Sequence, residues 1–308
     1  MIAVPSLRQL RHLAVLAEHG HFGRAARAAH VTQSTLSASI KELERTLGAV
    51  LIDRAQRRAV LTPLGQKIVE RARLVIAEAE ELVRAAKEGG APLAGELRLG
   101  VIPTVAPYLL PPILPRLRKA HPKLRLFLTE DLTERLVAQL DAGTLDMLLL
   151  ALPCDCGANE TTAIARDAFS VVVPKGHRFA AQKQVAPEAL QGEPVLLLKD
   201  GHCLREHALA ACALRDLSAP EGFEATSLLT LVQMVDNGIG ITLLPKMALD
   251  AGILRGTRLV ARPLAGDRSF REIGVAWRRG SARRAEYAML ADALRGLIGE
   301  RAVVAGRN

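Results

Sequence analysis

The sequence predicts an α/β protein with a helical region at its N-terminus and a larger region of alternating strands and helices. Apolar residues recur at helical spacing through residues 7–47. Beyond residue 91, short apolar runs alternate with helical patterns, as in a parallel sheet covered by helices. A long helical stretch that ends at Gly89-Gly90 separates the two regions. A chain of 308 residues is long enough for more than one core.

The composition is typical of a soluble globular protein, with 49% hydrophobic and 24% charged residues. No apolar run approaches the ~20 residues of a membrane span, so we expect no membrane partner. The segment Met1–Pro5 lacks the basic and apolar regions of a signal peptide. This favours a cytoplasmic protein over a periplasmic receptor. In the cytoplasm, the four cysteines are expected to be free, catalytic or redox-sensing rather than structural.

Positive charge gathers at the N-terminus. Residues 1–60 hold nine Lys or Arg against four Asp or Glu, so this fifth of the chain carries +5 of the net charge of +9. Such a bias indicates a nucleic-acid partner. Charge alone is equally compatible with an ordinary solvated surface.

Three helices are predicted in this basic region, over residues 7–18, 23–30 and about 33–47, with a tight turn at Val31-Thr32. Short polar side chains occupy the first turns of the third helix, as a recognition helix in the major groove requires. The alternative is an ordinary helical hairpin. The candidate DNA-contacting residues are Thr32, Gln33, Ser34, Thr35, Ser37, Ser39 and Lys41.

Residues 50–62 predict two short strands around a basic turn, which would form a wing beside the helices. Arg54, Arg57 and Arg58 lie in this turn and would reach phosphate or the minor groove. The wing makes the helical-hairpin alternative less attractive.

A long helix is predicted from Thr62-Pro63, with Thr62 as the cap and Pro63 in the first turn. Its narrow apolar stripe follows a near-heptad pattern, which favours pairing with a second chain. A two-fold dimer would present two recognition helices to a pseudo-palindromic site. The stripe consists of Leu64, Ile68, Ala72, Val75, Ala79, Leu82 and Ala86.

Cys203 and Cys212 stand out in the larger region. Cys203 falls in the first turn of a predicted helix over 202–214, where the helix dipole and free N–H groups favour a thiolate. Nine residues of helix separate the two side chains by ~13.5 Å along the axis, whereas a disulfide needs Cα atoms within roughly 7 Å. The pair is therefore either a redox switch that requires unwinding, or two small core residues.

One set of residues carries a family resemblance: Phe22–Ala26, Val31–Ser37, Ile40, Leu43-Glu44, Leu47-Gly48, Leu51 and Arg54. With these residues, the N-terminal region resembles the winged helix–turn–helix of LysR-type transcriptional regulators. The resemblance implies three domains: a winged helix–turn–helix at 1–62, a dimerisation linker helix and hinge at 63–90, and an effector domain at 91–308. It also implies a two-lobed, periplasmic-binding-protein-like effector domain, with lobe I at about 91–168 plus 269–308 and lobe II at about 169–268. Ser34 and Ser39 depart from the family's usual residues, so its base preferences do not transfer.

A finer resemblance, to the peroxide-sensing branch of this family, runs through Gly100–Pro111, Leu140–Gly143, Asp200–Arg205, Cys212, Ala225–Leu228 and Gly238–Pro245. It implies that Cys203 is the peroxidatic cysteine, oxidised by hydrogen peroxide to a sulfenic acid, and that Cys212 resolves it as a disulfide. The resemblance also implies peroxide-holding donors, which are Thr104, His202, Thr133 and Arg271.

Simpler interpretations stay open for several of these residues. Thr104 could serve only as a helix cap, and His202 only as a packed or capping group. Cys154-Asp155-Cys156 could bind a metal or form a strained disulfide, but no second pair and no matched His lie nearby in sequence, so we interpret it as a loop feature. No metal site and no cofactor are predicted.

The favoured function is a peroxide-sensing, DNA-binding transcriptional regulator that controls antioxidant genes and is not an enzyme; activation is expected, although the sequence does not distinguish it from repression. Its partners would be double-stranded DNA, hydrogen peroxide, RNA polymerase and further copies of itself, as a homodimer or homotetramer. One alternative is a LysR-type regulator that binds a small organic effector between the lobes, with incidental cysteines. Another is a thiol peroxidase that turns over, against which the basic N-terminal module argues.

Overall fold

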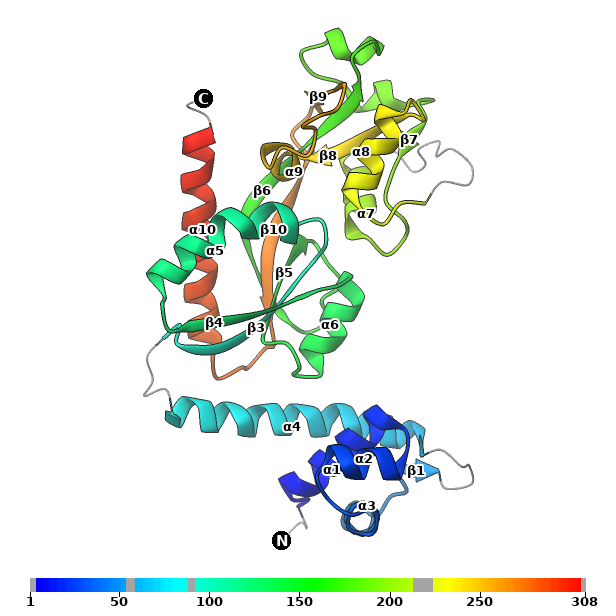
Figure 1. Cartoon of the computed structure of the whole chain (residues 1–308), viewed down its shortest axis with the longest axis vertical. Coiled ribbons are helices and arrows are strands. Elements are labelled where there is room, and N and C mark those ends of the chain that lie inside the picture. The colour runs from blue at the N-terminus through cyan, green and yellow to red at the C-terminus, as the bar shows by residue number, and fades with distance from the viewer. Residues whose placement is uncertain (1–3, 54–58, 88–91, 213–223, 306–308) are drawn as a thin grey trace. The chain divides into compact units, whose positions relative to one another are not determined.

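The computed structural model describes residues 4–53, 59–87, 92–212 and 224–305 of the chain (Figure 1). They belong to two compact units. One unit comprises residues 1–91 with 141–144, and the other comprises residues 92–140 with 145–308. Within the described ranges, no helix is both long and apolar enough to cross a bilayer.

The N-terminal unit contains three short helices packed around a small apolar core, followed by a two-stranded sheet and one long helix. Ser6 and Gln9 form a reciprocal capping box at the start of the first helix, and Gly20 ends it in the left-handed conformation. The predicted helices are confirmed to within two residues. The elements are α1 (Leu7–His19), α2 (Phe22–Ala28), α3 (Gln33–Leu47), β1 (Ile52–Asp53), β2 (Val60–Leu61) and α4 (Pro63–Lys87).

The predicted wing strands are confirmed as the antiparallel pair β1 and β2. Arg54, Arg57 and Arg58, in the turn between them, lie outside the described residues, as does most of the predicted hinge at 89–92. Thr62 connects the wing to α4. Its hydroxyl accepts a hydrogen bond from the Gly65 N–H at 2.9 Å and donates one to the Val50 carbonyl at 2.9 Å.

The predicted apolar stripe of α4 divides into two parts. Ala72 is buried and Ile68 is partly buried against the core of the N-terminal unit. Leu64, Val75 and Leu82 are 47%, 48% and 71% exposed. An amphipathic helix with exposed large apolar side chains has surface available for a further partner.

The larger unit is built on one twisted sheet with helices on both sides (Figure 1). Its strands are β3 (Gly95–Val101), β4 (Leu124–Glu130), β5 (Met147–Leu152), β6 (Glu160–Pro174), β7 (Val195–Leu196), β8 (Ile241–Pro245), β9 (Leu259–Pro263) and β10 (Phe270–Trp277). Its helices are α5 (Ala106–Ala120), α6 (Thr133–Asp141), α7 (Cys203–Cys212), α8 (Leu228–Asp236), α9 (Lys246–Asp250) and α10 (Arg284–Ala305), with 3₁₀ turns η1 (Arg178–Ala181) and η2 (Pro187–Leu190).

The prediction of a parallel sheet is correct only at its two ends. Strand order is β4-β3-β5-β10-β6-β8-β7, with β9 also paired to β6. The pairs β3–β4, β3–β5 and β7–β8 are parallel, whereas β10 and β6 run antiparallel to each of their neighbours. The parallel arrangement is confirmed for β3, β4 and β5, whereas in the centre an antiparallel β6–β10 pair joins the two parallel sets.

The sequence also predicted only residues 169–174 of β6, and it missed β9. The first half of β6, Glu160–Ala168, contains charged, Thr and Ala residues with only one large apolar side chain, and it pairs with β10. From Phe169 onward, β6 pairs with β8 and β9 instead. This strand therefore passes from one part of the sheet into the other at Ala168–Phe169.

Candidate functional site

The centre of the candidate site is Cys203, the first residue of α7. Strand β7 ends shortly before it, and Gly201 makes the intervening turn with φ of +92°, which glycine adopts without steric cost. Asp200 lies three residues before the first residue of the helix. Its carboxylate pairs with Arg205 Nε at 2.9 Å, while His202 is the residue immediately before the helix.

The Cys203 thiol is half-buried and lies among groups from three other elements. It forms hydrogen bonds with the side chain of Thr133, at the start of α6, and with the backbone of Ala151, in β5. Burial raises the pKa of the Cys203 thiol, and this outweighs the lowering by the Arg271 charge and by the Thr133 hydrogen bond. The resting site therefore favours the neutral thiol, contrary to the expectation from the helix terminus alone.

Arg271 is the buried cation of this site. On β10, its guanidinium donates from Nε to Asp167 Oδ2 at 3.0 Å and from Nη1 to Thr104 Oγ1 at 2.9 Å. Nη2 donates to the Thr104 carbonyl at 3.0 Å. The side chain is fully buried, so the Asp167 carboxylate balances its charge in a low-dielectric environment.

Asp167 was missed by sequence reasoning. It faces Arg271 across the β6–β10 pair, and its second oxygen accepts a hydrogen bond from the Met247 N–H at 2.9 Å. A single Asp between Arg166 and Ala168 has no motif to distinguish it. Only the antiparallel register of β6 and β10 shows its role.

Thr104 and His202 are both buried, at 3% and 8% exposure. Thr104 follows β3, and its hydroxyl accepts a hydrogen bond from Arg271. The N-cap position of α5 is Val105, which makes no side-chain cap hydrogen bond. The helix-cap alternative for Thr104 is therefore unsupported. Burial lowers the pKa of the His202 imidazole, which favours its neutral form.

Cys212 lies at the opposite end of α7 from Cys203, and both are free thiols in this structure. Cys212 is 2% exposed, and burial raises its pKa to about 11. The structure thus brings Cys203, Thr133, Arg271 and Thr104 into one network and leaves Cys212 apart from it.

Cys154 and Cys156, interpreted from the sequence as a loop feature, form a disulfide with Cα atoms 5.3 Å apart. They lie in the loop between β5 and β6. Cys156 is buried and Cys154 is partly exposed. Among the residues that the structure describes, no cluster of three or more His, Cys, Asp or Glu side chains is arranged to hold a metal.

The candidate DNA-contacting residues gather on the first half of α3. Thr32 caps the helix by accepting from the Thr35 N–H at 3.2 Å. Thr32, Gln33, Ser34 and Lys41 are exposed, whereas Thr35, Ser37 and Ser39 are half-buried. The opposite face, Leu36, Ile40 and Leu43, is completely buried in the core of the unit.

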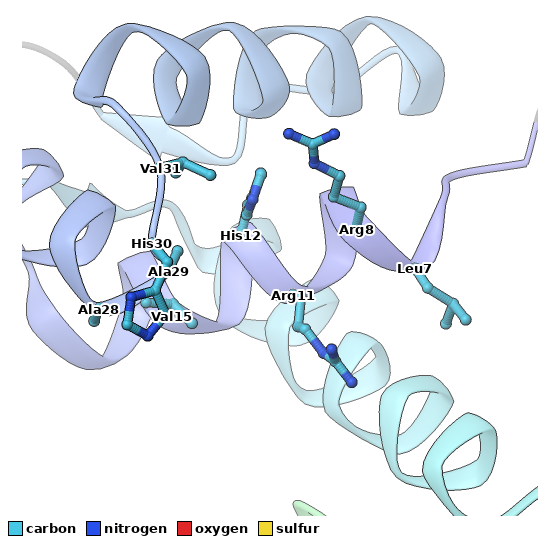
Figure 2. A pocket seen from close by; sticks show the side chains of 9 residues that line it. All are labelled: Leu7, Arg8, Arg11, His12, Val15, Ala28, Ala29, His30 and Val31. Atoms are coloured by element: carbon cyan, nitrogen blue, oxygen red, sulfur yellow. The ribbon is translucent and has the colours of Figure 1, made fainter. Parts of the chain in front are cut away.

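The same unit has a pocket of about 600 Å³ that none of these predicted residues lines (Figure 2). His12 in its wall is 5% exposed, and its Nδ1 has no hydrogen-bond partner among the described residues. Burial and the nearby Arg8 lower the pKa of His12. No sequence pattern predicted this pocket, which is lined by Leu7, Arg8, Arg11, His12, Val15, Ala28, Ala29, His30 and Val31.

Comparison with known proteins identifies the class. Residues 7–66 match the bacterial regulatory helix-turn-helix protein of the lysR family, and residues 90–298 match the LysR substrate binding domain. The chain therefore belongs to the LysR family of bacterial DNA-binding transcriptional regulators, as its sequence indicated.

Within the family, the chain is similar to OxyR proteins. It is 40% identical over 290 residues to the DNA-binding transcriptional dual regulator OxyR of Escherichia coli, covering 94% of this chain and 95% of the relative. It is also 40% identical over 296 residues to the HTH-type transcriptional regulator EstR of Acinetobacter baylyi, covering 96% and 98%.

Solved structures give the same picture. A full-length OxyR variant from Pseudomonas aeruginosa superposes with a TM-score of 0.76 at 33% identity, over 94% of each chain. A hydrogen-peroxide-bound OxyR mutant from Corynebacterium glutamicum gives a TM-score of 0.67 at 33% identity, over 99% of this chain and 97% of that one.

Proposed function

We propose that this LysR-family regulator senses hydrogen peroxide through Cys203 and changes its DNA binding in response. The observation that carries the proposal is the Cys203 thiol, half-buried beside Thr133 and the charge of Arg271, which itself bonds Thr104. Relatives named as hydrogen peroxide-inducible genes activators support the same conclusion.

The first chemical step joins peroxide to sulfur. The Cys203 thiolate attacks one peroxide oxygen, the O–O bond breaks, and the products are a sulfenic acid and hydroxide, which takes a proton to form water. Because burial favours the neutral thiol, a proton must leave Cys203 as peroxide binds. Thr104, Thr133 and His202 would hold the peroxide, and Arg271 would stabilise the departing hydroxide.

The second step forms the switch. The Cys212 thiol attacks the sulfenic sulfur, which joins the two sulfurs and releases water. The two cysteines lie at opposite ends of α7, so this bond requires the helix to unwind. The unwinding would remodel the contacts between subunits and thereby the spacing of the two DNA-binding modules.

The rest of the proposal concerns organisation and partners. Residues 1–62 would bind DNA through α3 and the arginines of the wing, residues 63–90 would dimerise, and residues 91–308 would sense. Lobe I would comprise about 91–168 plus 269–308, and lobe II about 169–268. The protein would act in the cytoplasm, without a cofactor or catalytic turnover, as a homodimer or homotetramer on pseudo-palindromic promoter sites with RNA polymerase.

Mass spectrometry of the reduced protein after a brief pulse of dilute peroxide tests the proposal. We expect a Cys203–Cys212 disulfide in the digested peptides, and a changed DNA footprint in the same sample. Unreacted Cys203 would overturn the redox mechanism and favour a regulator that responds to a small organic effector.

A further inference from the structure

The Cys154–Cys156 disulfide is the redox-capable group that the proposed switch does not use. It closes a loop of three residues, and so short a loop removes little conformational freedom from the unfolded chain. Stabilising the whole fold is therefore a poor explanation for it. Cys154 is partly exposed, and its neighbours Pro153 and Asp155 are exposed, so a small thiol can approach its sulfur.

The segment just before this disulfide contacts α7 at two points. The backbone of Ala151 bonds the Cys203 thiol. The His207 imidazole donates from Nε2 to the Pro153 carbonyl at 3.1 Å. Cys203 and His207 are four residues apart and therefore share one face of the helix.

Residues 151–153 thus run along the face of α7 that presents the Cys203 thiol, and Cys154 is the next residue. His207 is held mainly by this contact, because its Nδ1 is buried with no partner in the part of the chain that the structure describes. The loop at Cys154 is therefore joined to the Cys203 face of α7 through residues 151–153.

We propose that Cys154 and Cys156 form a second redox site, which exchanges with low-molecular-weight thiols and whose state sets the reactivity of Cys203. The effect on Cys203 rests on the proposed peroxide-sensing function, whereas the exchange itself does not. The closed disulfide holds residues 151–153 against α7, and the open dithiol releases them.

The exchange balances without any further reactant. A thiolate attacks Cys154 Sγ, breaks the Cys154–Cys156 bond and leaves a mixed disulfide at Cys154, while the Cys156 thiolate takes a proton. A second thiol then attacks the mixed disulfide. The products are a small-molecule disulfide and two protein thiols, so two electrons pass from the small thiols to the protein.

The exchange is tested in full-length Cys203→Ser/Cys212→Ser protein, where only Cys154 and Cys156 can react. The protein is equilibrated with mixtures of reduced and oxidised glutathione, and its free thiols are then alkylated. After digestion, mass spectrometry gives the mass of the peptide that contains Cys154 and Cys156. We expect a single two-electron transition from disulfide to dithiol as the reduced fraction rises. A peptide that stays in one state across all mixtures overturns the redox site.

The coupling is tested by the rate of Cys203–Cys212 formation after a peroxide pulse, in a glutathione mixture that keeps Cys203 reduced and Cys154–Cys156 oxidised. We expect Cys154→Ser/Cys156→Ser protein to react about threefold to tenfold more slowly, the effect of losing one hydrogen bond. The matched control Asp155→Asn, which keeps both sulfurs, should react at the wild-type rate. A cooperative thermal transition verifies that each variant is folded.

Two results distinguish a failure of the coupling between the two redox sites from a failure of the proposed peroxide-sensing function. Equal rates in the wild-type and double-serine proteins overturn the coupling and leave peroxide sensing intact. If no variant forms the Cys203–Cys212 bond, the proposed function fails and the coupling with it, while the glutathione transition still decides whether the second redox site exists.

Discussion

The recognition helix and the Cys203 site are built in opposite ways. On α3, the candidate functional side chains are exposed and bond locally, as Thr32 does with Ser34 and Thr35, while a separate apolar face makes the core. Around Cys203, the polar groups are buried and come from elements that are distant in sequence. Arg271, for example, forms hydrogen bonds with Asp167 and Thr104, each more than 100 positions away. In α3, different side chains serve function and stability, so one role can be changed without the other. In the Cys203 site, the same buried polar side chains serve both roles.

The largest effect is expected from Cys203→Ser, which removes the reacting atom and nearly preserves shape. Peroxide should then cause no change in the DNA footprint, while the reduced-state footprint and the melting temperature stay close to wild type. Footprinting with and without peroxide measures this. A response that survives the substitution would contradict the sensor mechanism and favour a small-molecule effector.

Arg271→Met tests whether the Cys203 site carries stability as well as function. The substitution leaves Asp167 buried without its partner, so the free energy of unfolding should fall by about 3–5 kcal/mol in chemical denaturation. In Arg271→Met/Asp167→Asn, the charge is gone and the amide oxygen can still accept from Met247, so most of the loss should return. A loss below ~1 kcal/mol in the single variant would mean that the two regions do not differ as described.

Gln33→Ala tests the other side of the contrast. An exposed base-reading side chain should contribute about 1–3 kcal/mol to specific DNA binding, and its removal should leave the melting temperature unchanged. Fluorescence anisotropy with a promoter fragment gives the affinity. Thr46→Ala, at the far end of the same helix, is the control and should bind like wild type. A variant that melts earlier would show that α3 does not separate the two roles.

The smallest expected effect is a pH dependence of the protein's stability that comes from His12 in the DNA-binding unit. Burial and Arg8 lower the pKa of His12 in the folded state from its ordinary 6.5, so the unfolded chain binds the proton more readily. The stabilising contribution of neutral His12 is fully present above pH 6.5. It is lost as the pH falls toward the lowered pKa that His12 has in the folded state. Between about pH 7.5 and pH 5.5, the melting temperature should therefore fall less in the His12→Phe protein than in the wild type. Equal slopes would exclude a contribution from His12.

The same contrast explains how much the sequence could predict. Helices of the N-terminal unit and the exposed residues of α3 follow from local periodicity and capping, and they were predicted within two residues. Thr104, Thr133 and Arg271 came from the family resemblance, and their common network depends on which strands pair. Asp167 had no local signal, because its role is set by register with a strand about one hundred residues away.

Errors in the fold have the same origin. An apolar run predicts a strand but not its direction, so the sequence did not show that the centre of the sheet is antiparallel. The polar half of β6 was missed because its pairing with β10 does not require an apolar pattern. The pocket around His12 also depends on how α1 meets the end of α2, which no single segment encodes (Figure 2).

The bonds of the Thr62 hydroxyl have a mechanical consequence. They join the first turn of α4, at Gly65, to Val50, which lies just before β1. We therefore expect the DNA-binding module and this 25-residue helix to rotate together as one rigid body. A helix of that length is about 37 Å long. A rotation of ~10° about one end moves the other by roughly 6 Å, close to the rise of two base pairs. A small rotation of the far end of α4 would therefore displace the DNA-binding module by a distance comparable to the spacing of base pairs.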